Sequence, residues 1–103
     1  MEAFAIKLTG SDLASRQTAA AERQRLLAQS VSGDRIAVDL SQVETVSYSY
    51  ADELFGVLVA VKGWEWFVQT ISLVNANEHI LRVIADVINR RLKETRQSLE
   101  CNV

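Results

Sequence analysis

Two serines lie where the sequence predicts the end of a loop and the start of a helix. Ser47 and Ser49 come just before the apolar segment from Tyr50 to about Val61, and a strand from Ile36 to Leu40 precedes the loop. The first backbone N–H groups of a helix have no partner within the helix and favour negative charge. A serine at such a junction can accept a phosphate, or it can cap the helix with its own oxygen. Both roles stay open for the two serines.

Aromatic and acidic side chains surround these serines. Tyr48 and Tyr50 flank Ser49, and an exposed tyrosine in a loop is typical of a protein interface, although either ring could instead pack beneath the loop. Asp52 and Glu53 fall in the first helical turn, where carboxylates complement the helix dipole. Adjacent helical positions point about 100° apart, so this pair does not converge as a general acid and base would. We expect the two carboxylates to be dipole partners or an acidic edge that binds a partner.

A single carboxylate interrupts the apolar strand. Asp39 lies within Ile36–Leu40, where it could face the edge of a parallel sheet at which ligands bind. The alternative, which we favour, is a carboxylate that accepts hydrogen bonds from N–H groups of the following loop. On that interpretation Asp39 holds the loop in place.

Residues suited to metal binding or catalysis are scarce. His79 is the only histidine, and neither Glu78 nor Cys101 completes a set of metal ligands with it. No serine or cysteine has the spacing to a histidine that would support nucleophilic catalysis, and the four glycines form no phosphate-binding loop. The sequence therefore predicts no catalytic residue, no metal site and no cofactor.

Charge and composition narrow the range of partners. The 103 residues carry a net charge of −2, which gives no electrostatic reason to expect nucleic acid. Cations do gather late in the chain, but acidic residues are interleaved with them, and this mixture predicts a solvated helix face. These late cations are Arg82, Arg90, Arg91, Lys93 and Arg96.

The single cysteine and the apolar runs bear on the compartment. Cys101 has no second cysteine to pair with, which fits a reducing environment. The N-terminal residues lack the basic flank and apolar run of a signal peptide, and the longest apolar run, Leu54–Val61, is too short to span a bilayer. We expect a cytoplasmic protein that does not contact a membrane.

Strands and helices alternate along the chain. Strands are predicted at Phe4–Leu8, Ile36–Leu40 and Thr70–Val74, and helices at Ser15–Ser30, from Tyr50 to about Val61, and after Asn75, which is expected to cap the third helix. The segment Trp64–Phe67 is ambiguous between a loop and the start of a strand. In the first helix, Arg16, Glu22, Arg23 and Arg25 are expected to face water.

The order of these elements indicates one α/β domain over residues 1–103. Alternation of strands with helices implies a mainly parallel sheet, right-handed crossovers and helices packed against the sheet. The strand Ile36–Leu40 is apolar on both faces apart from Asp39, which suits a central strand covered on both sides.

Several segments together resemble the STAS domain superfamily. They are Asp39–Ser41, Ser47–Leu54 and Leu73–Asn77, with Val43 and Val46 between them. The likeness is greatest to the bacterial STAS-like domains of unknown function, whose hallmark is a helix start similar to Tyr50–Phe55. The resemblance extends over roughly Ser15 to Ile88 and implies a small STAS-like fold.

The superfamily includes the anti-sigma factor antagonists. The resemblance implies a domain that binds a histidine-kinase-like ATPase or serine kinase and is switched off when that kinase phosphorylates a serine at a helix start. The antagonist pattern Asp-Ser-Ser-Gly corresponds to Ser47, Tyr48, Ser49 and Tyr50 in this chain, so Ser49 falls at the phosphorylated position. Ser47 replaces the acidic residue of that pattern, and Tyr50 replaces the glycine.

These observations lead to a hypothesis of a non-enzymatic regulatory module. Ser49 is the predicted phosphorylation site. An alternative is a domain that senses a nucleotide or small molecule, with Asp39 or Ser49 as contacts, and a homodimer is a third option. The predicted partner-binding residues are Ser47, Tyr48, Ser49, Tyr50, Asp52 and Glu53.

Overall fold

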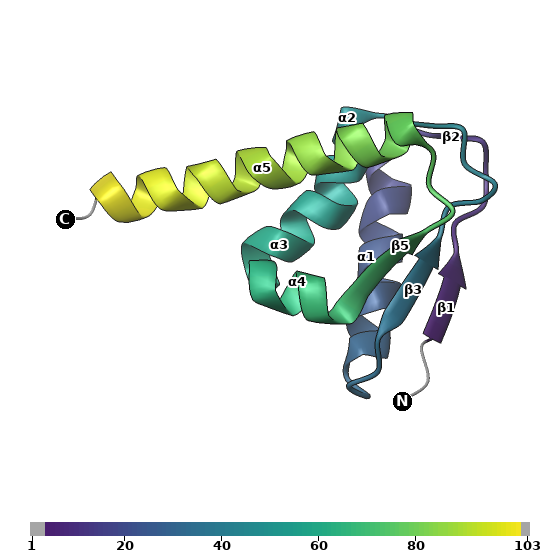
Figure 1. Cartoon of the computed structure of the whole chain (residues 1–103), viewed down its shortest axis with the longest axis horizontal. Coiled ribbons are helices and arrows are strands. Elements are labelled where there is room, and N and C mark those ends of the chain that lie inside the picture. The colour runs from purple at the N-terminus through teal and green to yellow at the C-terminus, as the bar shows by residue number, and fades with distance from the viewer. Residues whose placement is uncertain (1–3, 102–103) are drawn as a thin grey trace.

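A computed structural model describes residues 4–101, and the side chains of residues 5–95 (Figure 1). The strands are β1 (Phe4–Lys7), β2 (Asp12–Leu13), β3 (Ile36–Asp39), β4 (Thr45–Val46) and β5 (Ile71–Val74). The helices are α1 (Arg16–Ser30), α2 (Tyr48–Ala51), the π-helical turn η1 (Asp52–Gly56), α3 (Val57–Lys62), α4 (Trp64–Thr70) and α5 (Glu78–Cys101). The alternation predicted from the sequence is confirmed.

The main sheet is parallel, with strand order β1-β3-β5. Ile6, Val38 and Leu73 share one face because the register aligns them across the three strands, and this face packs into the core. Lys7 and Asp39 lie on the opposite face, which remains partly exposed. The expectation of a sheet covered on both sides is therefore wrong, since the helices pack on one side only of the described sheet (Figure 1).

A second, very small parallel sheet joins β2 to β4. Each strand has two residues, too few for an alternating pattern to reveal them in the sequence. The Thr45 hydroxyl donates to the Asp12 carboxylate at 2.6 Å, and the Ser47 N–H donates to the Leu13 carbonyl at 2.8 Å. This sheet fixes the loop that leads into α2.

The segment after Gly63 is helical. Gly63 has φ of 96°, a backbone conformation that favours glycine, so it ends α3 and lets the chain turn directly into α4. Phe67 of α4 is buried and meets Phe55 edge to face, while Trp64 stacks on Phe67. The ambiguous segment Trp64–Phe67 is thus a helical turn packed on the core rather than a loop or a strand.

The cap of α5 is Asn77. Its side-chain oxygen accepts from the Ile80 N–H at 2.9 Å, whereas Asn75, the predicted cap, has φ of 60° and belongs to the turn. The helix has 24 residues, so it is about 36 Å long, and its C-terminal half extends beyond the rest of the fold (Figure 1). Within the described residues, no helix is both long and apolar enough to span a bilayer.

One nearly continuous helix runs from α2 through η1 to α3. The pairs Tyr50–Ala51, Leu54–Phe55 and Leu58–Val59 are all buried in the core. They repeat every four residues, and an α-helix would let such a repeat drift by about 80° over eight residues. The wider turn of η1, in which the Val57 N–H bonds to the Asp52 carbonyl, compensates for part of this drift.

Candidate functional site

Ser47 is the residue that caps α2. Its backbone is extended, its hydroxyl oxygen accepts from the Tyr50 N–H at 3.0 Å, and its carbonyl accepts from the Ala51 N–H at 3.0 Å. The helix therefore begins at Tyr48, two residues before the predicted start. The capping role that the sequence left open between two serines belongs to Ser47, and such a cap stabilises a helix by about 1 kcal/mol.

Ser49 occupies the second position of the helix. Its side chain is half-buried, and within the described part of the chain its hydroxyl has no hydrogen-bond partner. The backbone N–H groups of Tyr48 and Ser49 have no acceptor within the helix, because Ser47 is the cap. The predicted phosphorylation site is thus a serine whose hydroxyl has no described hydrogen-bond partner. It lies next to two backbone N–H groups that have no acceptor within the helix.

The two tyrosines differ sharply in exposure. Tyr48 is 49% exposed and its hydroxyl donates to the Asp86 carboxylate at 3.0 Å, a hydrogen bond that raises the pKa of the phenol. Tyr50 is 1% exposed, and this burial raises its pKa to about 12. Of the two, only Tyr48 lies on the surface, and Tyr50 packs beneath the loop as part of the core.

Asp52 faces α5. Its two carboxylate oxygens accept from Arg91 at 2.8 and 2.7 Å, and this bidentate pair lowers the pKa of Asp52 and raises that of Arg91. Gly56 lies directly beside the Asp52 carboxylate, and a Cβ at that position would overlap it. The sequence predicted Arg91 to be solvated, which is wrong because Arg91 joins α5 to η1.

Glu53 faces α1. Its carboxylate accepts from Arg23 at 2.7 Å and from Arg16 at 3.2 Å, and the bond from Arg23 is the main reason that the pKa of Glu53 is lowered. Arg23 also donates to the Glu53 carbonyl, and its side chain is only 16% exposed. The prediction that Arg23 faces water is therefore wrong. We call Asp52, Glu53, Arg16, Arg23 and Arg91 the acidic clasp.

Asp39 is held at the end of β3. Its carboxylate accepts from the Ser41 N–H at 2.9 Å and from the Asn75 side chain at 3.1 Å, and these bonds, the first above all, lower its pKa. The favoured interpretation, a carboxylate that binds loop N–H groups, is confirmed. No described contact brings Asp39 to Ser49, so the two residues do not form one site.

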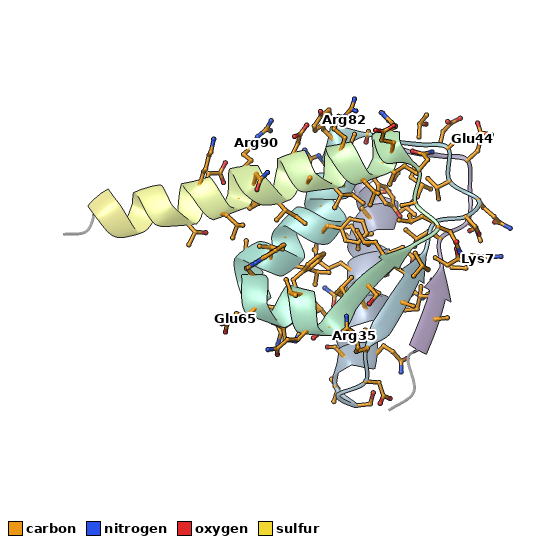
Figure 2. The ribbon with its side chains drawn as sticks, in the orientation of Figure 1. Lys7, Arg35, Glu44, Glu65, Arg82 and Arg90 are labelled. Atoms are coloured by element: carbon orange, nitrogen blue, oxygen red, sulfur yellow. The ribbon has the colours of Figure 1, made fainter. Side chains whose placement is uncertain are left out.

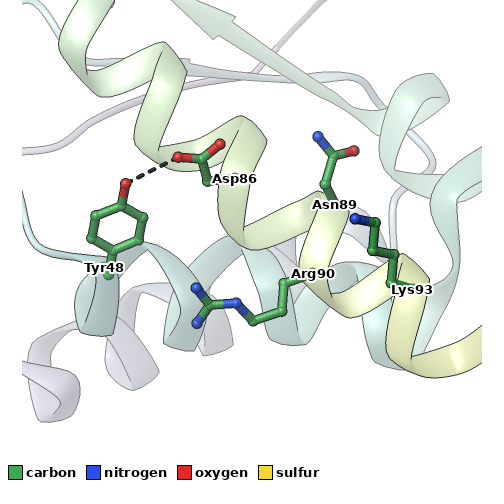
Figure 3. A pocket seen from close by; sticks show the side chains of 5 residues that line it. All are labelled: Tyr48, Asp86, Asn89, Arg90 and Lys93. Atoms are coloured by element: carbon green, nitrogen blue, oxygen red, sulfur yellow. Dashed lines mark hydrogen bonds between the residues drawn. The ribbon is translucent and has the colours of Figure 1, made fainter.

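An open groove lies between the start of α2 and α5 (Figure 3). It encloses about 610 Å³, and among the lining residues that the structure describes only Tyr48 lies outside α5. Figure 2 shows Arg82 and Arg90 projecting outward from the surface of the same helix. We call this cavity the α2–α5 groove, and it is lined by Tyr48, Asp86, Asn89, Arg90 and Lys93.

The sequence did not single out the α5 side of this groove. The four lining residues of α5 follow a spacing of i, i+3, i+4 and i+7, which places them on one helix face. That spacing was a usable signal, but nothing in the sequence says that Tyr48 lies opposite them. Among the described residues, no group of three histidine, cysteine, aspartate or glutamate side chains is arranged to hold a metal ion.

Comparison with known proteins identifies one family. The model of a STAS-like domain of unknown function matches residues 23–81, more than half of the chain. No curated protein and no solved structure matches the chain. The matched segment contains Ser47–Phe55, and it also contains Arg23, the partner of Glu53. Arg90, Arg91 and Lys93 follow the matched segment, in α5.

Proposed function

We propose a regulatory role for this chain, which belongs to the family of STAS-like domains of unknown function. Its parallel sheet with helices packed against one face is a STAS-like α/β fold. In our proposal the domain is not an enzyme. It binds a partner protein, a histidine-kinase-like ATPase or serine kinase, through the exposed part of the segment Ser47–Phe55, and phosphorylation of Ser49 releases that partner.

The division of labour between the two serines carries this proposal. Ser47 uses its hydroxyl to cap α2, so the hydroxyl of Ser49 is not needed for the fold. Ser49 also lies next to Tyr48, the exposed aromatic residue at the start of this helix. A serine whose hydroxyl makes no described hydrogen bond within the fold, and which adjoins an exposed aromatic side chain, is well suited to a switch.

A phosphate on Ser49 would be stabilised by the start of the helix and would weaken partner binding. It would add about −1.5 to −2 charge at pH 7, and the free N–H groups of the first helical turn would partly stabilise that charge. A partner packed against Tyr48 would meet the same charge across its interface. Phosphorylation would therefore leave the domain folded while weakening the complex.

Tyr50, Asp52 and Glu53 receive a different role in this proposal. Tyr50 is buried, and both carboxylates are bound by arginines of α1 and α5. These residues would hold the start of the helix in place rather than bind the partner directly. The direct contacts fall to Ser47, Tyr48 and Ser49.

The test is affinity capture of the tagged chain from lysate of its native host, with and without ATP. We compare wild type with Ser49→Asp, Ser49→Ala and a control, Ser32→Asp, which adds the same charge at an exposed serine in the loop between α1 and β3. Mass spectrometry identifies the captured proteins and the phosphorylation state of Ser49. We expect Ser49→Asp to reduce recovery of the ATPase at least about tenfold.

The controls make the result specific. Ser49→Ala and Ser32→Asp should capture the ATPase at the wild-type level, and Ser49→Ala should lose the phosphate signal. Equal recovery with wild type and Ser49→Asp would refute the switch. Recovery of no ATPase or kinase under any condition would refute the partner class.

A domain that senses a nucleotide remains the second candidate. The observation that favours it is the α2–α5 groove, whose volume of about 610 Å³ lies in the range of small-molecule sites. Arg90 and Lys93 could contact phosphate oxygens there. Saturable thermal stabilisation of the chain by GTP would support this alternative.

A further inference from the structure

The α2–α5 groove holds cations without partners. Arg90 and Lys93 line it, and among the side chains that the structure describes neither forms an ion pair. Arg91, between them in the sequence, is fully engaged with Asp52. Arg90 and Lys93 are therefore directed to the groove, while Arg91 stabilises the fold.

The groove also offers polar donors and an aromatic ring. Asn89 contributes a side-chain amide, and Tyr48 contributes the exposed ring and hydroxyl. Asp86 is the one acid among the described lining residues, and it already accepts a hydrogen bond from the Tyr48 hydroxyl (Figure 3). The donors left over favour an occupant with negative charge, and tyrosine and arginine are the residues that commonly dominate protein interfaces.

The shape of the groove selects among anionic occupants. Its α5 side runs from Asp86 to Lys93, a rise of about 10 Å along the helix, which matches three extended residues of a peptide. A nucleic acid needs a broad basic face, and this chain has a net charge of −2. A short acidic stretch of polypeptide fits both the length and the charge.

We infer that the α2–α5 groove binds an acidic segment of the partner protein, with Arg90 and Lys93 as its charge contacts and Tyr48 as its anchor. This inference rests on the proposed function for the identity of the partner. It adds the chemistry that the partner must present, a carboxylate-rich segment, and extends the interface from the start of α2 to α5.

The position of Arg90 links this groove to Ser49. The charge of Arg90 opposes the rise in the pKa of Tyr48 that the hydrogen bond to Asp86 causes, and it adds to the lowering of the pKa of Asp52 that Arg91 causes. Arg90 also lines the groove together with Tyr48, the residue that precedes Ser49. A phosphate on Ser49 would therefore place its charge next to the residue that anchors the acidic segment.

The first test is an NMR titration of the full-length, ¹⁵N-labelled chain. The probe is a ten-residue peptide of alternating glutamate and glycine, and the matched probe replaces each glutamate by glutamine. We expect the glutamate peptide to shift the amide signals of Tyr48, Asn89, Arg90 and Lys93, and the glutamine peptide to shift none. Shifts spread over the whole surface, or equal binding of both peptides, would overturn the inference.

Variants sharpen this test. Arg90→Gln/Lys93→Gln should bind the glutamate peptide about 2- to 30-fold more weakly, because each exposed charge contact contributes modestly. The control Arg25→Gln/Lys62→Gln removes two exposed cations outside the groove and should bind like wild type. Thermal unfolding of each variant verifies folding. Equal weakening in both double variants would show a nonspecific charge effect and overturn the inference.

The same variants separate this inference from the proposed function. If Ser49→Asp loses the captured ATPase while Arg90→Gln/Lys93→Gln retains it at the wild-type level, the groove inference fails and the proposed function stands. If the glutamate peptide binds the groove but no ATPase or kinase is captured, the proposed function fails and the groove remains a peptide site. Shifts of the groove signals by GTP, with none from the peptide, would overturn the inference in favour of a nucleotide.

Discussion

The acidic clasp and the α2–α5 groove use similar residues in opposite ways. In the clasp, Asp52 and Glu53 bind three arginines, and these contacts join η1 to α1 and α5. In the groove, Arg90 and Lys93 face an open cavity. Arg90 and Arg91 are adjacent in the sequence, yet one is directed to the groove and the other to the clasp.

This difference separates charges that support the fold from charges that can bind a partner. A charged side chain whose partner lies in the same chain has little left to offer another molecule, and breaking its pair destabilises the fold. An exposed cation without a partner costs the fold almost nothing to replace. The two regions should therefore respond differently to substitution, and stability measurements can break or sharpen the comparison.

The largest effect is expected at the buried tyrosine. Tyr50→Ala should lower the free energy of unfolding by about 3–5 kcal/mol, because it opens a cavity among core residues. Tyr48→Ala, two residues away, should leave the urea midpoint close to that of wild type. Urea unfolding followed by circular dichroism measures both. A Tyr48→Ala variant as unstable as Tyr50→Ala would contradict the assignment of Tyr48 to the surface.

The ion pair of Asp52 with Arg91 should give an intermediate effect. Asp52→Asn or Arg91→Gln should each lower the free energy of unfolding by about 1–2 kcal/mol, since the pair is bidentate and partly buried. A double-mutant cycle should give a coupling energy of at least about 0.5 kcal/mol. Additive single effects would show that the two side chains do not stabilise the fold as a pair.

Acid should lower the stability of the fold by protonating the two carboxylates of the acidic clasp. The pKa values of Asp52 and Glu53 lie below their ordinary values of 3.8 and 4.5, because arginines bind the charged forms. Their stabilising contribution is therefore complete above those ordinary values and is lost as the pH falls through the lowered ones. Stability measured from about pH 5 down to about pH 2 should decline less steeply in Asp52→Asn/Glu53→Gln than in wild type. Parallel curves would contradict this origin of the acid sensitivity.

The smallest effect is expected in the groove. Arg90→Gln/Lys93→Gln should change the free energy of unfolding by less than about 0.5 kcal/mol, because neither side chain has an ion pair in the described structure. A loss as large as that of Asp52→Asn would place these cations among the residues that support the fold. Urea unfolding at pH 7 decides between the two outcomes.

The sequence predicted the fold where a local pattern was sufficient. The period-two strand at β1 and the apolar stripe of α5 are local signals, and both elements occur as expected. The four-residue segment Trp64–Phe67 was ambiguous because it is too short to show a period, and only the turn at Gly63 makes it helical. The strands β2 and β4 carry no signal at all, since they exist only as a pair.

The sequence predicted the α2 side of the candidate site but not its α5 side. The junction chemistry located Ser47, Ser49 and Tyr48 at a helix start, because caps and turns are local. It could not assign Glu53 to Arg23, which is 30 residues away in the sequence, or place Tyr48 opposite Asp86. Such pairs arise from helix packing, which a single sequence does not reveal.

The π-helical turn η1 has a geometric consequence for the proposed switch. A π turn accommodates one residue more than an α turn, and each residue advances a helix by about 100°. Because η1 absorbs that extra residue in one wide turn, the buried pairs of α2 and α3 stay on the same side of the helix. With α-helical geometry throughout, the same residues would rotate the start of the helix, including Ser49, by up to about 80° relative to α3. The extra residue sets the direction in which the start of this helix points.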